Sequence, residues 1–165
     1  LVREPGPASG RLHAQPWLMA SPLDLSKRDG KPTLVIFEQK VCAGCDEMHA
    51  EGFPRPEVAA LLQRYRVARV DIAANEALKT PNGKSLSMRD WARQLKIAYT
   101  PSFVFFDAGG REVFRVEGYL RPFHLASSLD YVASGAYKKQ PEFQRFIEAR
   151  AAARRAQGEK IELMK

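Results

Sequence analysis

An apolar run and a cysteine pair stand close together in the first third of the chain. Residues 33–37 read Thr-Leu-Val-Ile-Phe, and the tetrapeptide Cys-Ala-Gly-Cys follows at 42–45. A run with no charged position is typical of a strand that is buried on both faces of a sheet. Helical sequence begins at Asp46, so the cysteine pair lies at a strand-to-helix junction. This junction predicts an α/β fold with the strand inside its sheet.

The remaining strands follow from local patterns. Segment 67–72 predicts a second strand, and segment 102–107 predicts a third. A Gly-Gly turn at 109–110 precedes alternating residues at 112–117, which indicates a β-hairpin. Strand–helix–strand crossovers give parallel strands, whereas the hairpin gives an antiparallel pair. The sequence therefore predicts a mixed central β-sheet with helices on both faces.

Helices are expected between and after these strands. The helix that follows the cysteines is expected to be kinked or split at residues 52–54 (Gly-Phe-Pro), because proline interrupts a helix. Ser87 is expected to be the N-cap of another helix, which runs to Ile97. Further helices are expected at 21–28, 121–131 and 141–156, and segment 73–87 is expected to be an inserted loop.

Length and charge limit the classes of protein that need consideration. A chain of 165 residues is the size of one domain, and its apolar runs are too short to span a membrane. The net charge is +7, but residues 136–165 hold eight basic and four acidic residues, so more than half of the excess lies in a helical tail. This distribution argues against nucleic acid as a partner, and the short apolar runs argue against membrane insertion.

The ends of the chain differ in composition from its middle. Residues 1–16 are rich in proline and glycine, which predicts a flexible leader before a domain at 17–137. Residues 138–165 are expected to form a basic amphipathic helix and tail. The chain starts without methionine or a signal peptide, which indicates a fragment trimmed by removal of an export signal or cut at a domain boundary.

Redox chemistry explains the cysteine pair better than its alternatives do. At a helix start, backbone N–H groups stabilise the Cys42 thiolate, which is the attacking species in disulfide exchange, and Cys45 lies one turn away. Haem attachment requires a histidine where Asp46 stands. A zinc site using His49 lacks a nearby fourth ligand, so we expect His49 to be a surface residue. A purely structural disulfide across such a short loop stabilises little.

A family resemblance becomes visible once a later motif is considered. Thr100 and Pro101 open the third strand, and Gly118 follows the hairpin. Together with the strand at 33–37 and the cysteine pair, they make residues 30–134 similar to thioredoxin-fold proteins. The resemblance implies that Pro101 is cis and faces the cysteines. It also implies that Thr100 pairs with the backbone of an extended substrate, and it calls for no cofactor or metal.

The chain departs from thioredoxins in its buried acid. Ile36 stands where the family places an aspartate six residues before the first cysteine, which removes the usual proton acceptor. Glu38 is a candidate for proton transfer in its place, although it could equally point to solvent. Lys40 favours a thiolate nearby, whereas Asp46 and Glu47 oppose it.

A closer resemblance is to exported bacterial thioredoxins of the sulfur-oxidation, SoxW-like, type. It rests on the sequence around the cysteines at 37–49, on residues 100–106 and 118–124, and on Gly-Ala-Tyr at 135–137. The resemblance implies a periplasmic thiol–disulfide oxidoreductase that a membrane electron donor keeps reduced. Its substrate would be a disulfide-bearing protein or a thiol. Tyr119, Phe123 and His124 either flank the substrate groove or pack a helix onto the sheet.

Three other functions remain open from the sequence. The same fold serves disulfide oxidants and isomerases, and residues 43–44 set no direction. A copper or zinc carrier would use Cys42, Cys45 and a remote histidine such as His124. A non-catalytic adaptor would carry its thiols incidentally. The favoured hypothesis is a reductase in which Cys42 attacks and Cys45 resolves.

Overall fold

Strand β1 lies inside a four-stranded sheet of order β2-β1-β5-β6 in the computed structural model, which describes residues 8–159 and 161. The strands are β1 (Thr33–Glu38), β2 (Arg66–Asp71), β5 (Ser102–Phe106) and β6 (Glu112–Glu117). β1 pairs parallel with β2 and antiparallel with β5, and β5 pairs antiparallel with β6. The predicted mixed sheet is thereby confirmed.

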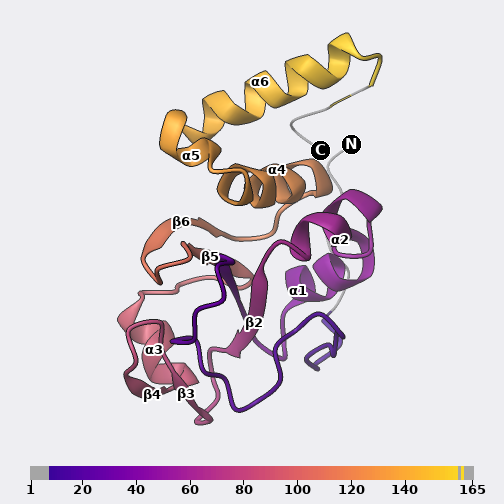
Figure 1. Cartoon of the computed structure of the whole chain (residues 1–165). Coiled ribbons are helices and arrows are strands. Elements are labelled where there is room, and N and C mark those ends of the chain that lie inside the picture. Colours follow the sequence, from indigo (N-terminus) through magenta and orange to yellow (C-terminus); the bar gives the residue numbers. More distant parts are fainter. Residues whose placement is uncertain (1–7, 160, 162–165) are drawn as a thin grey trace.

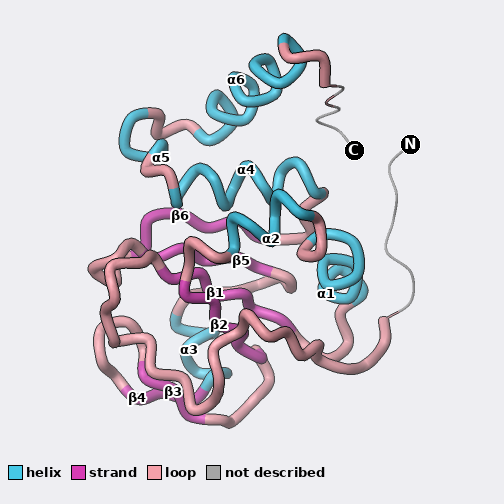
Figure 2. Tube along the Cα trace, turned by 45° about the vertical axis from the view of Figure 1, so that its right-hand side comes forward, coloured by secondary structure: helices cyan, strands magenta, loops and turns pink. Residues whose placement is uncertain are grey.

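Both faces of β1 are buried, as the apolar run predicts. Leu34 and Ile36 pack into one core cluster, against α2 (Pro56–Leu62) and α4 (Pro122–Ala133). The alternate residues of the strand pack into a second cluster that includes three residues of α3 (Met88–Gln94). Figures 1 and 2 show α2 and α4 on one side of the sheet and α3 on the other. Helices therefore cover both faces.

The helix after the cysteines is split, as the proline predicts. It consists of α1 (Ala43–Glu47), a π-helical turn η1 (Met48–Gly52) and, beyond residues 53–55, α2. Phe53 N donates to the carbonyl of Met48 at 2.8 Å, which closes the wide turn. The break lets α1 and α2 pack in different directions on the same face of the sheet.

Two expectations about the segments around Leu23 and residues 73–87 are wrong. Residues 21–28 form no helix; Leu25 N donates to the carbonyl of Lys79, and Lys79 N donates to that of Leu23. These bonds hold the segment extended beside β3 (Ala77–Lys79), which pairs with β4 (Ser85–Ser87). The expected loop is thus partly a small hairpin. The backbone partners of residues 23–25 lie more than fifty residues away in sequence, where local propensity gives no signal.

The chain ends in two helices, α5 (Ala136–Lys139) and α6 (Phe143–Ala156). α6 buries Ile147 and Ala151, and Figure 1 shows it stacked over α4, at the opposite end of the molecule from β3 and β4. The predicted C-terminal helix is confirmed. Among the described residues, no helix is both long and apolar enough to cross a membrane.

Candidate active site

The two cysteines occupy the start of α1, immediately after the loop that leaves β1. A disulfide joins Cys42 and Cys45, and both side chains are buried. Cys42 is the N-cap residue of α1, and its Sγ accepts a hydrogen bond from Cys45 N at 3.0 Å. The first turn of the helix therefore supplies a backbone donor to the sulfur that the sequence designates as the nucleophile.

Pro101 lies against the cysteine loop. The Thr100–Pro101 peptide bond is cis, and a Cβ built on Gly44 would lie 3.1 Å from Pro101 Cδ. Gln39 Nε2 donates to Thr100 Oγ1 at 2.9 Å, which links the loop before the cysteines to the loop before β5. The structure thus brings together the four residues expected at the centre of the site: Cys42, Cys45, Thr100 and Pro101.

Two large hydrophobic side chains are exposed next to the predicted site residues. Val41 is 72% exposed and Tyr99 is 65% exposed, and they are the large hydrophobic residues that stand out as exposed among the described residues. One directly precedes Cys42 and the other directly precedes Thr100. Exposed apolar side chains that cluster at one place mark a binding surface. A groove of about 390 Å³, lined by Gln39, Lys40, Val41, Asp71, Ala73 and Ala74, adjoins this surface.

Glu38 points inward and not to solvent. Its side chain is only 1% exposed, and its carboxylate oxygens lie 3.0 and 3.1 Å from His49 Nε2. A buried carboxylate without a partner is strongly destabilising, so this hydrogen bond accounts for its burial. The structure therefore removes the solvent-facing alternative for Glu38.

His49 is the site residue that sequence reasoning missed. The expectation of a surface histidine is wrong, because the His49 side chain on η1 is 5% exposed and the N-terminal segment covers it. His49 lies four residues after Cys45, which places both on one face of the helix. Glu38 lies four residues before Cys42. The two spacings together were the signal in the sequence that Glu38 and His49 could meet beside the cysteines.

Part of the expected leader at 1–16 makes defined contacts with the helix that follows the cysteines. From residue 9 to residue 15 it contacts α1 and η1: Ser9 and His13 bind Asp46, and Gln15 binds His49. Its polar side chains find partners on the helix, which composition alone does not reveal. Residues 1–7 of the expected leader lie outside the described residues.

The residues after β6 have mixed roles. Tyr119 Cβ lies 3.5 Å from the position of a Cβ on Gly44, so this tyrosine borders the cysteine loop. Phe123 instead packs beneath the guanidinium groups of Arg150 and Arg154, where it helps to seat α6. His124 is half-buried, and that burial lowers its pKa. Among the described residues, no three His, Cys, Asp or Glu side chains are arranged to hold a metal ion.

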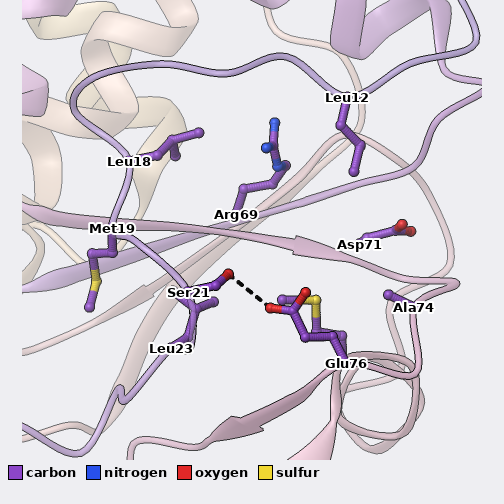
Figure 3. A pocket seen from close by; sticks show the side chains of 10 residues that line it. Leu12, Leu18, Met19, Ser21, Leu23, Arg69, Asp71, Ala74 and Glu76 are labelled. Carbon is purple, nitrogen blue, oxygen red and sulfur yellow. Dashed lines mark hydrogen bonds between the residues drawn. The ribbon is translucent and has the colours of Figure 1, made fainter.

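A separate pocket of about 160 Å³ lies between the N-terminal segment, β2 and the turn before β3. Figure 3 shows the Ser21 hydroxyl facing the carboxylate of Glu76, with a hydrogen bond of 2.9 Å. Arg69 and Asp71 line the same pocket. None of the residues predicted for the redox site lies in it.

Comparison with known proteins agrees with this geometry. A family model for the thioredoxin-like domain matches residues 19–133. The chain belongs to the thioredoxin-like domain family. A thioredoxin-fold protein from Helicobacter pylori superposes with a TM-score of 0.73 at 15% identity, covering 83% of this chain and 94% of that one. A DsbH oxidoreductase superposes with a TM-score of 0.51 at 19% identity, covering 75% and 86%. Both likenesses support the fold.

A curated relative shares more of the sequence. The thiol:disulfide interchange protein DsbD of Tatumella citrea is 29% identical over 98 residues, which are 58% of this chain and 15% of the relative. The chain therefore spans less than a fifth of the length of that relative. Family membership and the Cys42–Cys45 disulfide together identify this thioredoxin-like chain as a thiol–disulfide oxidoreductase.

Proposed function

We propose that the chain is a periplasmic reductase of protein or small-molecule disulfides. The observation that carries the proposal is the joint position of the cysteine pair and Pro101: Cys42 caps α1, Cys45 lies one turn on, and Pro101 packs against the residue between them. Val41, directly before Cys42, is exposed and would contact an approaching substrate. The oxidised pair described here is the product state of such a reduction.

The first step is attack by the Cys42 thiolate on one sulfur of the substrate disulfide. The substrate S–S bond breaks, one substrate thiolate leaves and takes a proton from water, and a mixed disulfide forms with Cys42. Cys45 then loses its proton and attacks Cys42 Sγ. The bond between Cys42 and the substrate breaks, and the second substrate thiolate leaves and takes up the proton that Cys45 released. The substrate gains two electrons and two protons, and the enzyme disulfide forms.

Glu38 is proposed as the acceptor of the Cys45 proton. It is a buried carboxylate at the end of β1, and its partner His49 lies one helical turn beyond Cys45. The position that thioredoxins give to an acid holds Ile36 here, which belongs to the apolar core. A buried base near the resolving thiol speeds the step in which that thiol must ionise.

Thr100 and Pro101 are proposed to position the substrate. Their loop lies beside the cysteines, and an extended chain that pairs with the Thr100 backbone would present its cysteine to Cys42. The exposed Tyr99 ring would add apolar contact to the same chain. A thioredoxin-like unit at 17–137 with an appended basic helix and tail at 138–165 remains our proposed division of the chain.

The setting is also a proposal. The similarity to DsbD and the sequence features shared with SoxW-like thioredoxins support a periplasmic location and a membrane protein as the electron donor. Fractionation of the native host with an antibody to the chain would test the location. Recovery of the chain in the cytosolic fraction would contradict it.

Two measurements test the reaction and its direction. Cys42→Ser should abolish reduction of insulin disulfides, whereas Cys45→Ser should trap a mixed disulfide with substrate. Retention of activity by Cys42→Ser would refute the mechanism. The equilibrium reduction potential of the pair decides the direction: about −270 mV or lower is typical of reductants, and about −120 to −180 mV of oxidants and isomerases.

A further inference from the structure

His49 sits in a cage built largely by the N-terminal segment. The ring of His13 stacks on it at 4.7 Å between centroids with an interplanar angle of 20°. The Trp17 ring lies nearly parallel to the His49 ring at 6.3 Å, and Phe53, directly after η1, meets the His49 ring edge-on at 4.9 Å. Two of the three rings come from residues 13–17, so the segment and the helix together fix the plane of the imidazole.

Hydrogen bonds fix the tautomer of the same ring. Gln15 Nε2 lies 3.0 Å from His49 Nδ1, and an amide NH₂ group only donates, so Nδ1 accepts. The ring proton therefore sits on Nε2, which donates to the Glu38 carboxylate. Gln15 and Glu38 thus both favour the same tautomer of His49, with the proton on Nε2.

The segment is also fastened to the residue next to Cys45. The carboxylate of Asp46 accepts hydrogen bonds from Ser9 N at 2.6 Å and Ser9 Oγ at 2.9 Å, and lies 2.6 Å from His13 Nε2. Partial burial alone would raise the pKa of Asp46, but the hydrogen bonds from His13 and Ser9 outweigh it and the pKa is lowered. Arg69 of β2 donates to the carbonyl of His13 and holds the segment from the other side.

The family match places this segment outside the shared domain. The match begins at residue 19, whereas the contacts to α1 and η1 come from residues 9–17. Figures 1 and 2 show the segment passing beside α1. Its two attachment points on the helix, Asp46 and His49, lie one and four residues after Cys45.

We propose that the N-terminal segment is part of the redox site, and that Gln15 and His49 are positioning residues for Glu38. Held by Gln15, His49 keeps the Glu38 carboxylate oriented to take the proton from Cys45 Sγ. As that proton leaves, the Cys45–Cys42 bond forms and the substrate–Cys42 bond breaks. The inference rests on the proposed function, because it assigns roles within that same reaction.

Gln15 is the most informative position to change. The charged and titratable groups around His49 are Glu38 from β1, Asp46 and Glu47 from α1, His13 from the segment and Arg69 from β2. Gln15→Leu leaves each of these groups in place and removes only the donor to Nδ1. Gln63→Leu, at an exposed glutamine after α2, is the matched control.

The experiment follows the resolving step in the full chain. The reduced protein is mixed with a dye-labelled peptide disulfide, and release of the second thiol is timed from pH 5 to pH 9. A positioned base typically contributes ~100-fold or more to a rate, and we expect Gln15→Leu to remove part of this contribution. The release of the second thiol should therefore slow by about tenfold, and the pH profile of this release should change shape. The first step, measured in Cys45→Ser, should be unchanged. Gln63→Leu should match the parent protein throughout.

A spectroscopic readout separates positioning from a structural role. Nitrogen-15 NMR should show the Nε2–H tautomer of His49 in the parent protein and a loss of that preference in Gln15→Leu. Gln15→Glu, which keeps the size of the side chain but can only accept a hydrogen bond from Nδ1, serves as a second variant if Gln15→Leu does not fold, and should slow the resolving step as well. An unchanged resolving rate, or a loss matched by the unfolded fraction with the same pH profile, would overturn the proposal. No exchange by the parent protein would instead refute the proposed function.

Discussion

Two segments flank the part of the chain that matches the family, and they attach in different ways. The N-terminal one, before residue 19, meets α1 and η1 through hydrogen bonds and stacked rings, beside the cysteine pair. The C-terminal one, after residue 133, meets α4 through buried side chains of α6, including Ile147. Its aromatic residues cluster with Tyr131, and its arginines reach Glu57.

The two modes of attachment predict different roles: the C-terminal segment stabilises the fold, and the N-terminal segment affects the reaction. Burial of apolar side chains is non-directional and stabilises the fold without orienting any reacting group. Hydrogen bonds to a buried imidazole do orient one, because each ring nitrogen takes a defined role. We therefore expect changes in the C-terminal segment to alter unfolding, and changes in the N-terminal segment to alter the reaction. The predictions below test this division, beginning with the largest effect.

Truncation of Ile147 should produce the largest change in stability. The side chain is buried between α6 and the body, and Ile→Ala in a core typically costs about 2–5 kcal/mol. Chemical denaturation should show such a loss for Ile147→Ala, while the exchange rate of the folded protein stays the same. Glu148→Ala, at the neighbouring exposed position, should change neither. A slower exchange reaction in folded Ile147→Ala would contradict the view that the C-terminal segment affects only stability.

Neutralising Glu57 should cost less. Hydrogen bonds from Arg154 lower the pKa of Glu57, burial opposes them, and further bonds from Arg150 add to the lowering. Because the carboxyl is partly exposed, we expect Glu57→Gln to lose about 1 kcal/mol of unfolding free energy at pH 7. The sign follows from the lowered pKa: the contribution is complete above the ordinary value of 4.5 and disappears as pH falls through the folded pKa. Denaturation midpoints of parent and variant should therefore converge in acid; a constant gap down to pH 3 would contradict this.

Sequence reasoning succeeded where the signal is local. The strand at 33–37 could be predicted because all of its residues are apolar or β-branched, and each face of β1 has its own core cluster. The break at 52–54 followed from a proline, and the cap at Ser87 from its side chain, which accepts from Asp90 N at 3.0 Å. The cysteine pair and the Thr100–Pro101 pair were recognisable by residue type and order alone.

It failed where a residue's surroundings come from far along the chain. Leu25 pairs with Lys79, and no pattern within 21–28 announces that partner, so the segment was expected to be helical. His49 is buried because Gln15 and Trp17 cover it from a segment whose composition predicts a loose leader. In both cases, the missing information is a long-range contact, and at His49 that contact lies in the redox site.

The charge of Asp46 gives the smallest predicted effect and the finest test of the comparison. Asp46 lies in the first turn of α1 beside the cysteines, and its negative charge opposes formation of a thiolate on Cys42. Asp46→Asn should therefore increase the rate at which iodoacetamide alkylates Cys42 of the reduced protein at pH 7, by about threefold. Asp90→Asn, in the first turn of α3, is the matched control and should leave the rate unchanged. Glu57→Gln should also leave it unchanged, because the C-terminal contacts lie on α2 and α4. If Glu57→Gln altered alkylation as much as Asp46→Asn, the two segments would not be separable, and the C-terminal helix would have to be counted with the redox site.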